Sequence, residues 1–391
     1  MTHKKDSELV HLGRRKAWTG GAVNPPVYHA STILFDTVEE LRNAYKAPHE
    51  TMAYGRRGTP TTFALAEALA KLEGGAGAVI YPSGLAAVTT AILSFVAAGD
   101  HMLMIDTVYE PTRTFCDQML SKFGVEVEYF DPLIGGDIAA LIRDNTSVVF
   151  VESPGSVTME VADVPAIVKA AHDAGSLVLM DNTWATPLYF EALGHGVDVS
   201  IHALTKYVVG HSDAMLGAAI ANDRAITRLR AHSGHIGQCA GPDDIYLGLR
   251  GLRTLSVRLA RHQQSALEIA AWLKERDEVA RVLHPALPDC PGHELWKRDF
   301  HGASGLFSII LKHDDKDAET AFLEGMTHFK MGFSWGGFES LVMAYRGIKN
   351  CRTATRWHAE GTVIRLHVGL EDVDDLKADL DAAFARYRAA L

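Results

Sequence analysis

Cysteine is scarce in this chain of 391 residues, which has only four: Cys116, Cys239, Cys290 and Cys351. They lie far apart, and no two of them form a C-x-x-C pair. In a chain of this length, such sparse cysteines are typical of reduced thiols in a cytosolic protein. We therefore expect them to serve mainly in packing, and we expect a cytoplasmic location.

Long hydrophobic runs and an excess of positive charge are also missing. The longest apolar stretch, 85–98, contains hydroxyl residues and is too short to cross a bilayer. The N-terminal segment 1–18 carries charges but no apolar core like that of a secretory signal. Lys and Arg number 38 against 48 Asp and Glu, and the net charge of -10 argues against non-specific nucleic-acid binding. We expect neither a membrane nor a nucleic acid as a partner.

The region 59–253 alternates short apolar runs with helical patterns. We expect strands at 78–81, 101–106, 125–130, 148–151, 177–181, 197–201 and 215–221. We expect helices between them at 61–72, 85–97, 111–123, 137–143 and 164–174. This alternation predicts an α/β fold, in which a mostly parallel sheet carries helices on both faces.

The rest of the chain has a different texture on either side of this region. Residues 1–58 show little periodicity apart from a helix at 38–45, yet they contain many apolar side chains, so we expect an arm that contacts a neighbouring subunit. A long amphipathic helix at 254–276 opens the region 254–391, in which helices mix with strands at 279–283, 306–311, 341–345 and 363–368. The pattern predicts a smaller α+β C-terminal domain.

Two of the expected strands deliver titratable residues at the same edge of the sheet. The run 177–180 ends in Asp181, and the run 197–201 is followed closely by Thr205 and Lys206. In an open α/β sheet, ligands bind at the carboxyl ends of the strands. A lysine and a carboxylate there match the needs of pyridoxal phosphate (PLP), whose aldehyde binds a lysine and whose cationic ring nitrogen pairs with an acid. Taken alone, Lys206 is more simply interpreted as a surface lysine, and Asp181 as a helix cap or a metal ligand.

Other residues at this edge suit the remaining parts of such a cofactor. Ser83, Gly84 and Leu85 lie between a strand and a helix, where backbone amides bind phosphate, although an ordinary Ser-Gly turn is the simpler interpretation. The hydroxyl of Thr205 can add to the same phosphate. Tyr109 follows another strand and can stack on a flat ring, but it also suits the start of a loop.

Three further sites carry polar or aromatic groups whose partners the sequence does not reveal. Arg365 lies within the apolar strand TVIRLHVG and needs an anion, either a substrate carboxylate or a structural salt bridge. Ser334 and Trp335 belong to a tight turn, S-W-G-G, that can form a pocket wall. Tyr54 and Arg56 form a polar pair in the arm; arginine suits a phosphate, whereas a solvated loop is the alternative.

Motifs of several other enzyme classes are absent. The chain has 19 histidines but no H-E-x-x-H or comparable ligand spacing, so we expect no metal site. It has no G-x-S-x-G elbow of a serine hydrolase and no G-x-x-x-x-G-K-[ST] phosphate loop of a nucleotide-binding protein.

Together, these motifs resemble the Cys/Met-metabolism family of PLP enzymes, the cystathionine lyases and synthases. The matching segments follow the family's order over nearly the whole chain: AYGRRGTPT at 53–61, YPSGLAA at 81–87, DNTWATP at 181–187, LTKYVVGHSD at 204–213, RGLRTL at 250–255, SWGGFESL at 334–341 and TVIRLHVGLEDVDDL at 362–376. The resemblance implies PLP-dependent transferase fold type I, the aspartate-aminotransferase-like fold. It also implies a homo-oligomer, a dimer of dimers with shared active sites.

The resemblance assigns a role to each candidate residue. Lys206 would bind PLP covalently, Asp181 would pair with its ring nitrogen, and Tyr109 would stack on the ring. The phosphate would be held by Ser83, Gly84, Leu85 and Thr205, together with Tyr54 and Arg56 of a neighbouring subunit. Arg365 and Ser334 would bind the substrate carboxylate, beside Trp335. Lys206 would take the α-proton, with Tyr109 or Tyr54 assisting.

Within the family, the β-lyase branch is the most similar, chiefly through the segments 152–167 and 284–300 and the S-W-G-G turn. This implies β-elimination of L-cystathionine to homocysteine, pyruvate and ammonia, a step of methionine biosynthesis, with activity on other cysteine S-conjugates. A γ-acting lyase or synthase and a non-catalytic PLP-fold binding protein are the alternatives. Two departures are Ala203, where many relatives have serine, and Phe333, where β-lyases have tyrosine.

Overall fold

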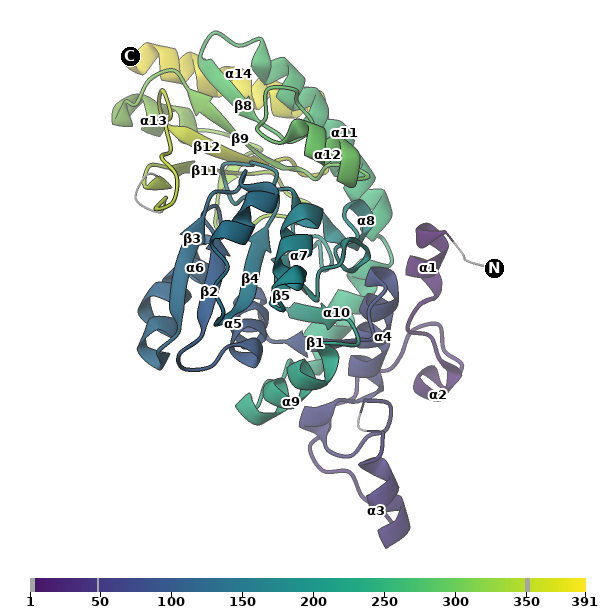
Figure 1. Ribbon diagram of the computed structural model, residues 1–391. Helices are drawn as coiled ribbons and strands as arrows, with labels where there is room; N and C mark the ends of the chain where they lie inside the picture. The colour runs from purple at the N-terminus through teal and green to yellow at the C-terminus, as the bar shows by residue number, and fades with distance from the viewer. Residues whose placement is uncertain (1–3, 48, 349–351) are drawn as a thin grey trace.

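The computed structural model describes residues 4–47, 49–348 and 352–391. Its core is a seven-stranded sheet with the strand order β1-β7-β6-β5-β4-β2-β3 (Figure 1). The strands are β1 (Gly77–Tyr81), β2 (His101–Ile105), β3 (Glu126–Phe130), β4 (Thr146–Glu152), β5 (Leu177–Asp181), β6 (Val199–His202) and β7 (Gly217–Ala221). Only β7 runs antiparallel to its neighbours β1 and β6, so the prediction of a mostly parallel sheet is confirmed.

Both faces of this sheet are buried, which explains its apolar strands. Side chains alternate between the two faces along each strand. In β7, Ala218 and Ile220 join the hydrophobic cluster that contains α4 (Pro60–Glu73). Ala219 and Ala221 join the other cluster, which contains α5 (Gly84–Phe95). Further helices complete the layers: α6 (Glu110–Gln118), α7 (Val164–Asp173), α8 (Thr186–Tyr189), α9 (Ile226–Ile236) and α10 (Pro242–Leu252).

A second, five-stranded sheet of order β10-β11-β12-β9-β8 lies beyond the carboxyl edge of the first sheet (Figure 1). Its strands are β8 (Val279–Leu283), β9 (Leu306–Leu311), β10 (Lys330–Met331), β11 (Leu341–Tyr345) and β12 (Val363–His367). Its helices are α11 (Leu255–Lys274), α12 (His293–Asp299), α13 (Lys316–Leu323) and α14 (Val373–Ala390). The expected α+β character of this region is confirmed. The boundary at 253–254 stays a prediction, and it falls between α10 and α11.

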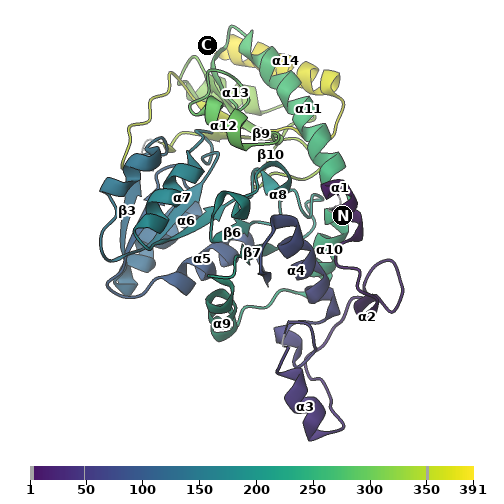
Figure 2. The same cartoon turned by 45° about the vertical axis from the view of Figure 1, so that its right-hand side comes forward.

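The N-terminal arm divides into a packed part and a projecting part. The packed part holds α1 (Lys5–His11) and α2 (Lys16–Thr19); Leu9 and Trp18 are buried against the cluster that contains α4. The projecting part holds α3 (Val38–Ala44), which extends away from the body of the molecule in two views (Figures 1 and 2). Its apolar side chains Leu34 and Val38 are 89% and 63% exposed.

Several helices differ from the sequence-based expectation. The expected helix at 137–143 is a 3-10 helix at Gly135–Ala140. No helix was expected for α9, α10 or α12; glycine weakens the helical pattern of α9 at one position and of α10 at two, whereas α12 is only seven residues long. These helices depend on contacts with the rest of the fold, which a local pattern does not record.

Two other expectations can be compared with the structure. Cys116 and Cys290 are buried free thiols and Cys239 is exposed, whereas Cys351 lies outside the described residues. Within the ranges described, no helix is both long and apolar enough to span a membrane.

Candidate active site

Three neighbouring strands bring acidic and basic groups to one edge of the large sheet. Strands β4 and β5 end at Glu152 and Asp181, which lie opposite each other in the paired register. The next strand, β6, leads into the turn that carries Lys206. The predicted meeting of Asp181 and Lys206 at the carboxyl edge follows from this parallel pairing.

Lys206 lies in a largely enclosed position. Its Nζ is 2.5 Å from the Oγ of Ser334 and 5.2 Å from the ring centroid of Trp335. Burial, and then the positive charge of Arg365, lower the pKa of Lys206 to about 8, although Asp181 opposes this shift. A neutral amine is therefore accessible near neutral pH, as a nucleophile or a base requires.

Asp181 lacks a cationic partner of its own. Burial raises its pKa, while hydrogen bonds from Thr183 and the nearby His202 and Lys206 act in the opposite direction. Thr183 donates its backbone N–H to Oδ1 at 3.0 Å. Across the described chain, no Lys, Arg or His nitrogen lies within salt-bridge distance of this carboxylate. A cationic ligand placed here would complete the environment of Asp181.

Glu152 is a member of the site that the sequence reasoning missed. Its Oε2 accepts a hydrogen bond from the backbone N–H of Tyr109 at 2.7 Å. Burial, and then the adjacent Asp181, raise the pKa of Glu152 well above its usual value. Two neighbouring carboxyl groups whose environments differ separate into a protonated and an ionised member. The usable signal was a glutamate that ends a buried strand beside the strand of Asp181.

Tyr109 lies just before α6, with its side chain 44% exposed. Burial raises the pKa of its phenol, and Glu152, Tyr345 and Asp181 raise it further. The ring is therefore close to the other acidic groups at this edge, as expected, and stays protonated at neutral pH.

The expected phosphate cradle packs directly against the turn of Lys206. Ser83 caps α5, because its Oγ accepts the N–H of Ala86 at 3.1 Å. A Cβ on Gly84 would come within 2.4 Å of the Cβ of Ala203, so a side chain cannot be accommodated there. Leu85 follows and is 39% exposed. The start of α5 thus presents free amides close to the lysine.

Thr205 is brought to the same place, but its hydroxyl is already occupied. It donates to the carbonyl of Leu216 at 3.1 Å and accepts the N–H of Leu216 at 2.9 Å. Contact with a phosphate requires this hydroxyl to turn away from Leu216.

Arg365 reaches the site from β12 in the smaller sheet and is 8% exposed. Its Nη2 donates to the carbonyl of Ser334 at 3.1 Å, and its guanidinium lies 5.2 Å from the ring centroid of Tyr345. No Asp or Glu of the described ranges forms a salt bridge with it. The described residues thus provide no carboxylate partner for Arg365. Of the two anions considered, this leaves the substrate carboxylate.

Within one chain, neither Tyr54 nor Arg56 forms a hydrogen bond with Lys206. Tyr54 is 43% exposed, and Arg56 donates to the carbonyl of Gly234 at 3.1 Å. Arg56 also lines a broad hollow whose walls are formed by the arm, α4 and α9 and do not include Lys206.

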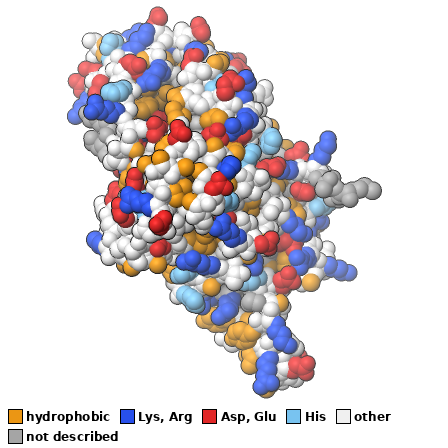
Figure 3. Space-filling view, in the orientation of Figure 1, with side chains coloured by type: hydrophobic (Ala, Val, Ile, Leu, Met, Phe, Trp, Pro, Cys, Tyr) orange, Lys and Arg blue, Asp and Glu red, His pale blue; other side chains and the backbone are white. Residues whose placement is uncertain are grey.

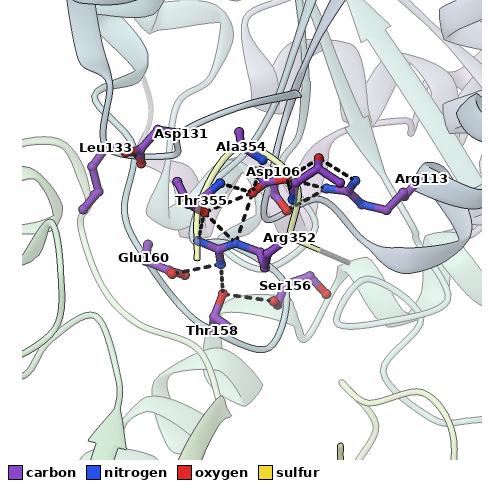
Figure 4. A network of polar contacts seen from close by, with 11 residues as sticks. Asp106, Arg113, Asp131, Leu133, Ser156, Thr158, Glu160, Arg352, Ala354 and Thr355 are labelled. Atoms are coloured by element: carbon purple, nitrogen blue, oxygen red, sulfur yellow. Dashed lines mark hydrogen bonds and ion pairs between the residues drawn. The ribbon is translucent and has the colours of Figure 1, made fainter. Parts of the chain in front are cut away.

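Another carboxylate at the same sheet edge, Asp106, is fully satisfied by the protein (Figure 4). It accepts Nη2 of Arg113 at 2.7 Å and the backbone N–H groups of 353–355 at 2.9–3.1 Å. Arg352 adds an ion pair at 3.4 Å and also contacts Glu160. Asp106 therefore joins the large sheet to the segment that precedes β12.

The Cys/Met metabolism PLP-dependent enzyme family matches residues 6–385 of this sequence. The chain belongs to this family. Cystathionine beta-lyase MetC of Escherichia coli is 51% identical, with 99% of this chain and 100% of the relative covered. An L-alanine/L-glutamate racemase of Wolbachia pipientis wMel is 44% identical, with 98% and 97% covered. A crystal structure of cystathionine gamma synthase from Xanthomonas oryzae pv. oryzae with cystathionine has a TM-score of 0.90 at 30% identity, with 100% of both chains covered.

The residues at the sheet edge fit PLP. Lys206 offers an amine of lowered pKa, Asp181 a carboxylate without a cation, and the start of α5 free amides at Gly84, whose missing side chain lets the helix pack directly against Ala203. The cofactor of this family is PLP, and the fold is its aspartate-aminotransferase-like fold, as expected.

Proposed function

We propose that this protein is a PLP-dependent carbon–sulfur lyase that cleaves L-cystathionine by β-elimination into homocysteine, pyruvate and ammonia. The observation that carries the proposal is the buried guanidinium of Arg365, which lies beside Lys206 and has no carboxylate partner among the described residues. A substrate α-carboxylate is the anion that would complete it. The 51% identity to a cystathionine beta-lyase supports the choice of reaction.

Each residue has a task that its environment supports. Arg365 would hold the carboxylate of the substrate and so orient its α-carbon toward Lys206. Lys206, with a pKa of about 8, would take the α-proton and deliver it to the sulfur atom that leaves the β-carbon as the thiol homocysteine. Asp181 would pair with the ring nitrogen, whose positive charge favours the ionised carboxylate, whereas burial and the adjacent Asp181 favour the neutral form of Glu152. When bound, PLP withdraws electrons from the carbon that loses its proton.

The products distinguish this reaction from its alternatives. PLP-loaded protein is incubated with L-cystathionine, and the keto acid is identified. Pyruvate together with homocysteine is expected. Formation of 2-oxobutyrate would contradict the proposal and support a γ-acting enzyme. In a separate incubation with L-alanine, D-alanine formed without any keto acid would instead indicate a racemase, which is what the Wolbachia relative is named. Bound PLP with no turnover at all would indicate a non-catalytic protein.

We further propose that the site is shared between subunits of a homo-oligomer, a dimer of dimers. The support is the exposed apolar surface of the arm, seen as orange side chains on the lower projection in Figure 3, together with the exposure of Tyr54 and the place of Arg56 in a hollow that does not include Lys206. The two residues would contact the phosphate of a neighbouring site. Hybrids of Lys206→Ala and Arg56→Ala chains should regain activity, since one site per pair keeps both residues. Hybrids as inactive as the parents would count against sharing.

A cytoplasmic location is also proposed, on the basis of the sparse, widely spaced cysteines. Cell fractionation with the protein in the cytosolic fraction is the expected result, and enrichment in any other compartment would contradict it.

A further inference from the structure

Strand β12 carries a second buried side chain on the same face as Arg365. His367 lies two residues further along the strand, and residues two apart on a strand share a face. Its side chain is 1% exposed and packs near the rings of Tyr207 and His262, with centroid distances of 6.0 Å and 5.3 Å.

Both ring nitrogens of His367 bind the backbone of the turn 334–339, which begins with the S-W-G-G motif. Nε2 accepts the N–H of Gly336 at 3.0 Å, and Nδ1–H donates to the carbonyl of Glu339 at 3.0 Å. An N–H can only donate and a carbonyl can only accept, so this pair of bonds requires the neutral ring with its proton on Nδ1. Burial, and then His262, lower the pKa of His367 well below its usual value, which keeps the ring in this form.

The turn that His367 holds is in direct contact with Lys206. Ser334 adopts φ of 80°, an uncommon conformation for a residue with a side chain, and it places its Oγ on Lys206 and its carbonyl on Arg365. Gly336 packs so closely that a Cβ would lie 2.9 Å from the Cα of Lys206. An uncommon backbone conformation of this kind persists only when the surrounding structure fixes it. The turn therefore needs an anchor on the side that faces away from Lys206.

We propose that His367 is a positioning residue, which fixes the 334–339 turn against Lys206 and thereby sets the affinity for the substrate carboxylate at Arg365. The proposal rests on the function proposed above. A histidine that serves only the core would stabilise the fold without affecting ligand binding. The two accounts therefore differ in their effect on binding, not in their effect on stability.

The test compares His367→Phe, His367→Asn and His367→Gln in the PLP-loaded protein. Phe supplies an aromatic ring without hydrogen-bonding groups, Asn is too short to reach both partners, and Gln is longer and offers a donor and an acceptor. The ligand is glycine, which has no β-carbon and cannot undergo elimination, and its binding is followed through the absorbance of the bound cofactor. His284→Asn is the control, because His284 is fully buried, its Nδ1 accepts the backbone N–H of Ala286, and it follows β8, which β9 separates from β12 in the sheet.

We expect the Kd of glycine to rise about ten-fold or more in His367→Phe and His367→Asn. His367→Gln should stay within about three-fold of the wild type, and His284→Asn should lose stability without changing the Kd. With L-cystathionine, KM should change more than kcat. If His367→Phe does not fold, His367→Asn decides. A Kd unchanged in the folded variants, or equally weakened in all four, would overturn the proposal. Because glycine does not react, failure of the β-lyase proposal would show separately, as missing pyruvate.

Discussion

Asp106 and Asp181 are two carboxylates at the same edge of the same sheet, and they differ in exposure and in the partners that the protein supplies. Asp106 is 2% exposed and receives hydrogen bonds from Arg113 and from the backbone of 353–355. Asp181 is partly accessible and receives its one backbone hydrogen bond from Thr183. The protein thus supplies the counter-charge for one carboxylate and leaves the other for a ligand.

The arginines nearby repeat this difference. Arg113 and Arg352 both pair with Asp106, whereas Arg365 binds only a carbonyl within the described residues. A charge that the fold satisfies contributes to stability, whereas a charge left without a partner marks a binding site. The following predictions test this distinction.

Asp181→Asn should give the largest effect on activity. Loss of the carboxylate removes the group that keeps the cofactor nitrogen cationic, so kcat/KM for β-elimination should fall by about 100-fold or more. The folded structure should remain as stable as the wild type or become more stable, because a partly buried charge is removed. Steady-state kinetics and denaturation of the same preparation check both statements. Wild-type turnover in this variant would contradict the assignment.

Arg365→Leu should weaken substrate binding by at least about 30-fold in kcat/KM, with most of the change in KM. The fold should tolerate this replacement, since no protein carboxylate loses its partner among the residues described. Arg365→Lys, which keeps the charge but not the two-pronged geometry, should fall in between. An unchanged KM in the leucine variant would show that the carboxylate binds elsewhere.

Asp106→Asn should have the opposite effects to Asp181→Asn and Arg365→Leu: a loss of stability, with little loss of activity per folded molecule. Burial alone would raise the pKa of Asp106, but hydrogen bonds from Thr353, Thr355 and Arg113 hold it below its usual value. The stabilisation is therefore present above the usual carboxylate pKa of about 4 and is lost as the pH falls through the lower pKa of the folded state.

At neutral pH the Asp106 variant should lose about 3 kcal/mol in the free energy of unfolding, measured by urea denaturation. Asp131→Asn is the matched control, because Asp131 is exposed and accepts one backbone N–H, from Leu133. It should change stability by less than about 0.5 kcal/mol. Equal effects of the two substitutions would remove the distinction.

The smallest effect concerns the pH dependence of PLP uptake by the apoenzyme. Only the neutral amine of Lys206 reacts with the aldehyde, and a pKa of about 8 makes about a tenth of it neutral at pH 7. The rate of uptake should rise about ten-fold between pH 7 and pH 9 and then level off. A rate that still climbs steeply above pH 9 would indicate an ordinary lysine.

The sequence was sufficient to predict the parallel sheet and the place of Asp181 and Lys206, because both depend on local pattern. Apolar runs mark the strands, and the residues after parallel strands must meet at one edge. The resemblance to the family added roles that no local pattern contains, such as the contact of Tyr54 and Arg56 with the phosphate of a neighbouring subunit.

Contacts between distant segments escaped prediction. Nothing in the apolar strand β12 shows that His367 reaches back to Gly336, 31 positions away. Asp106 looked like the end of a strand, yet its partners come from 353–355. The helices α9 and α10 were missed because their glycines and polar residues are tolerated only through tertiary packing.

The affinity for PLP is the most direct test of the distinction between Asp106, which the protein satisfies, and Asp181, which is left for a ligand. The Kd of PLP would be determined by equilibrium dialysis for the wild type, Asp181→Asn and Asp106→Asn. We predict that Asp181→Asn binds PLP about ten-fold more weakly or worse, while folded Asp106→Asn binds it as the wild type does. Wild-type affinity in Asp181→Asn, or an equal loss in both variants, would contradict the account.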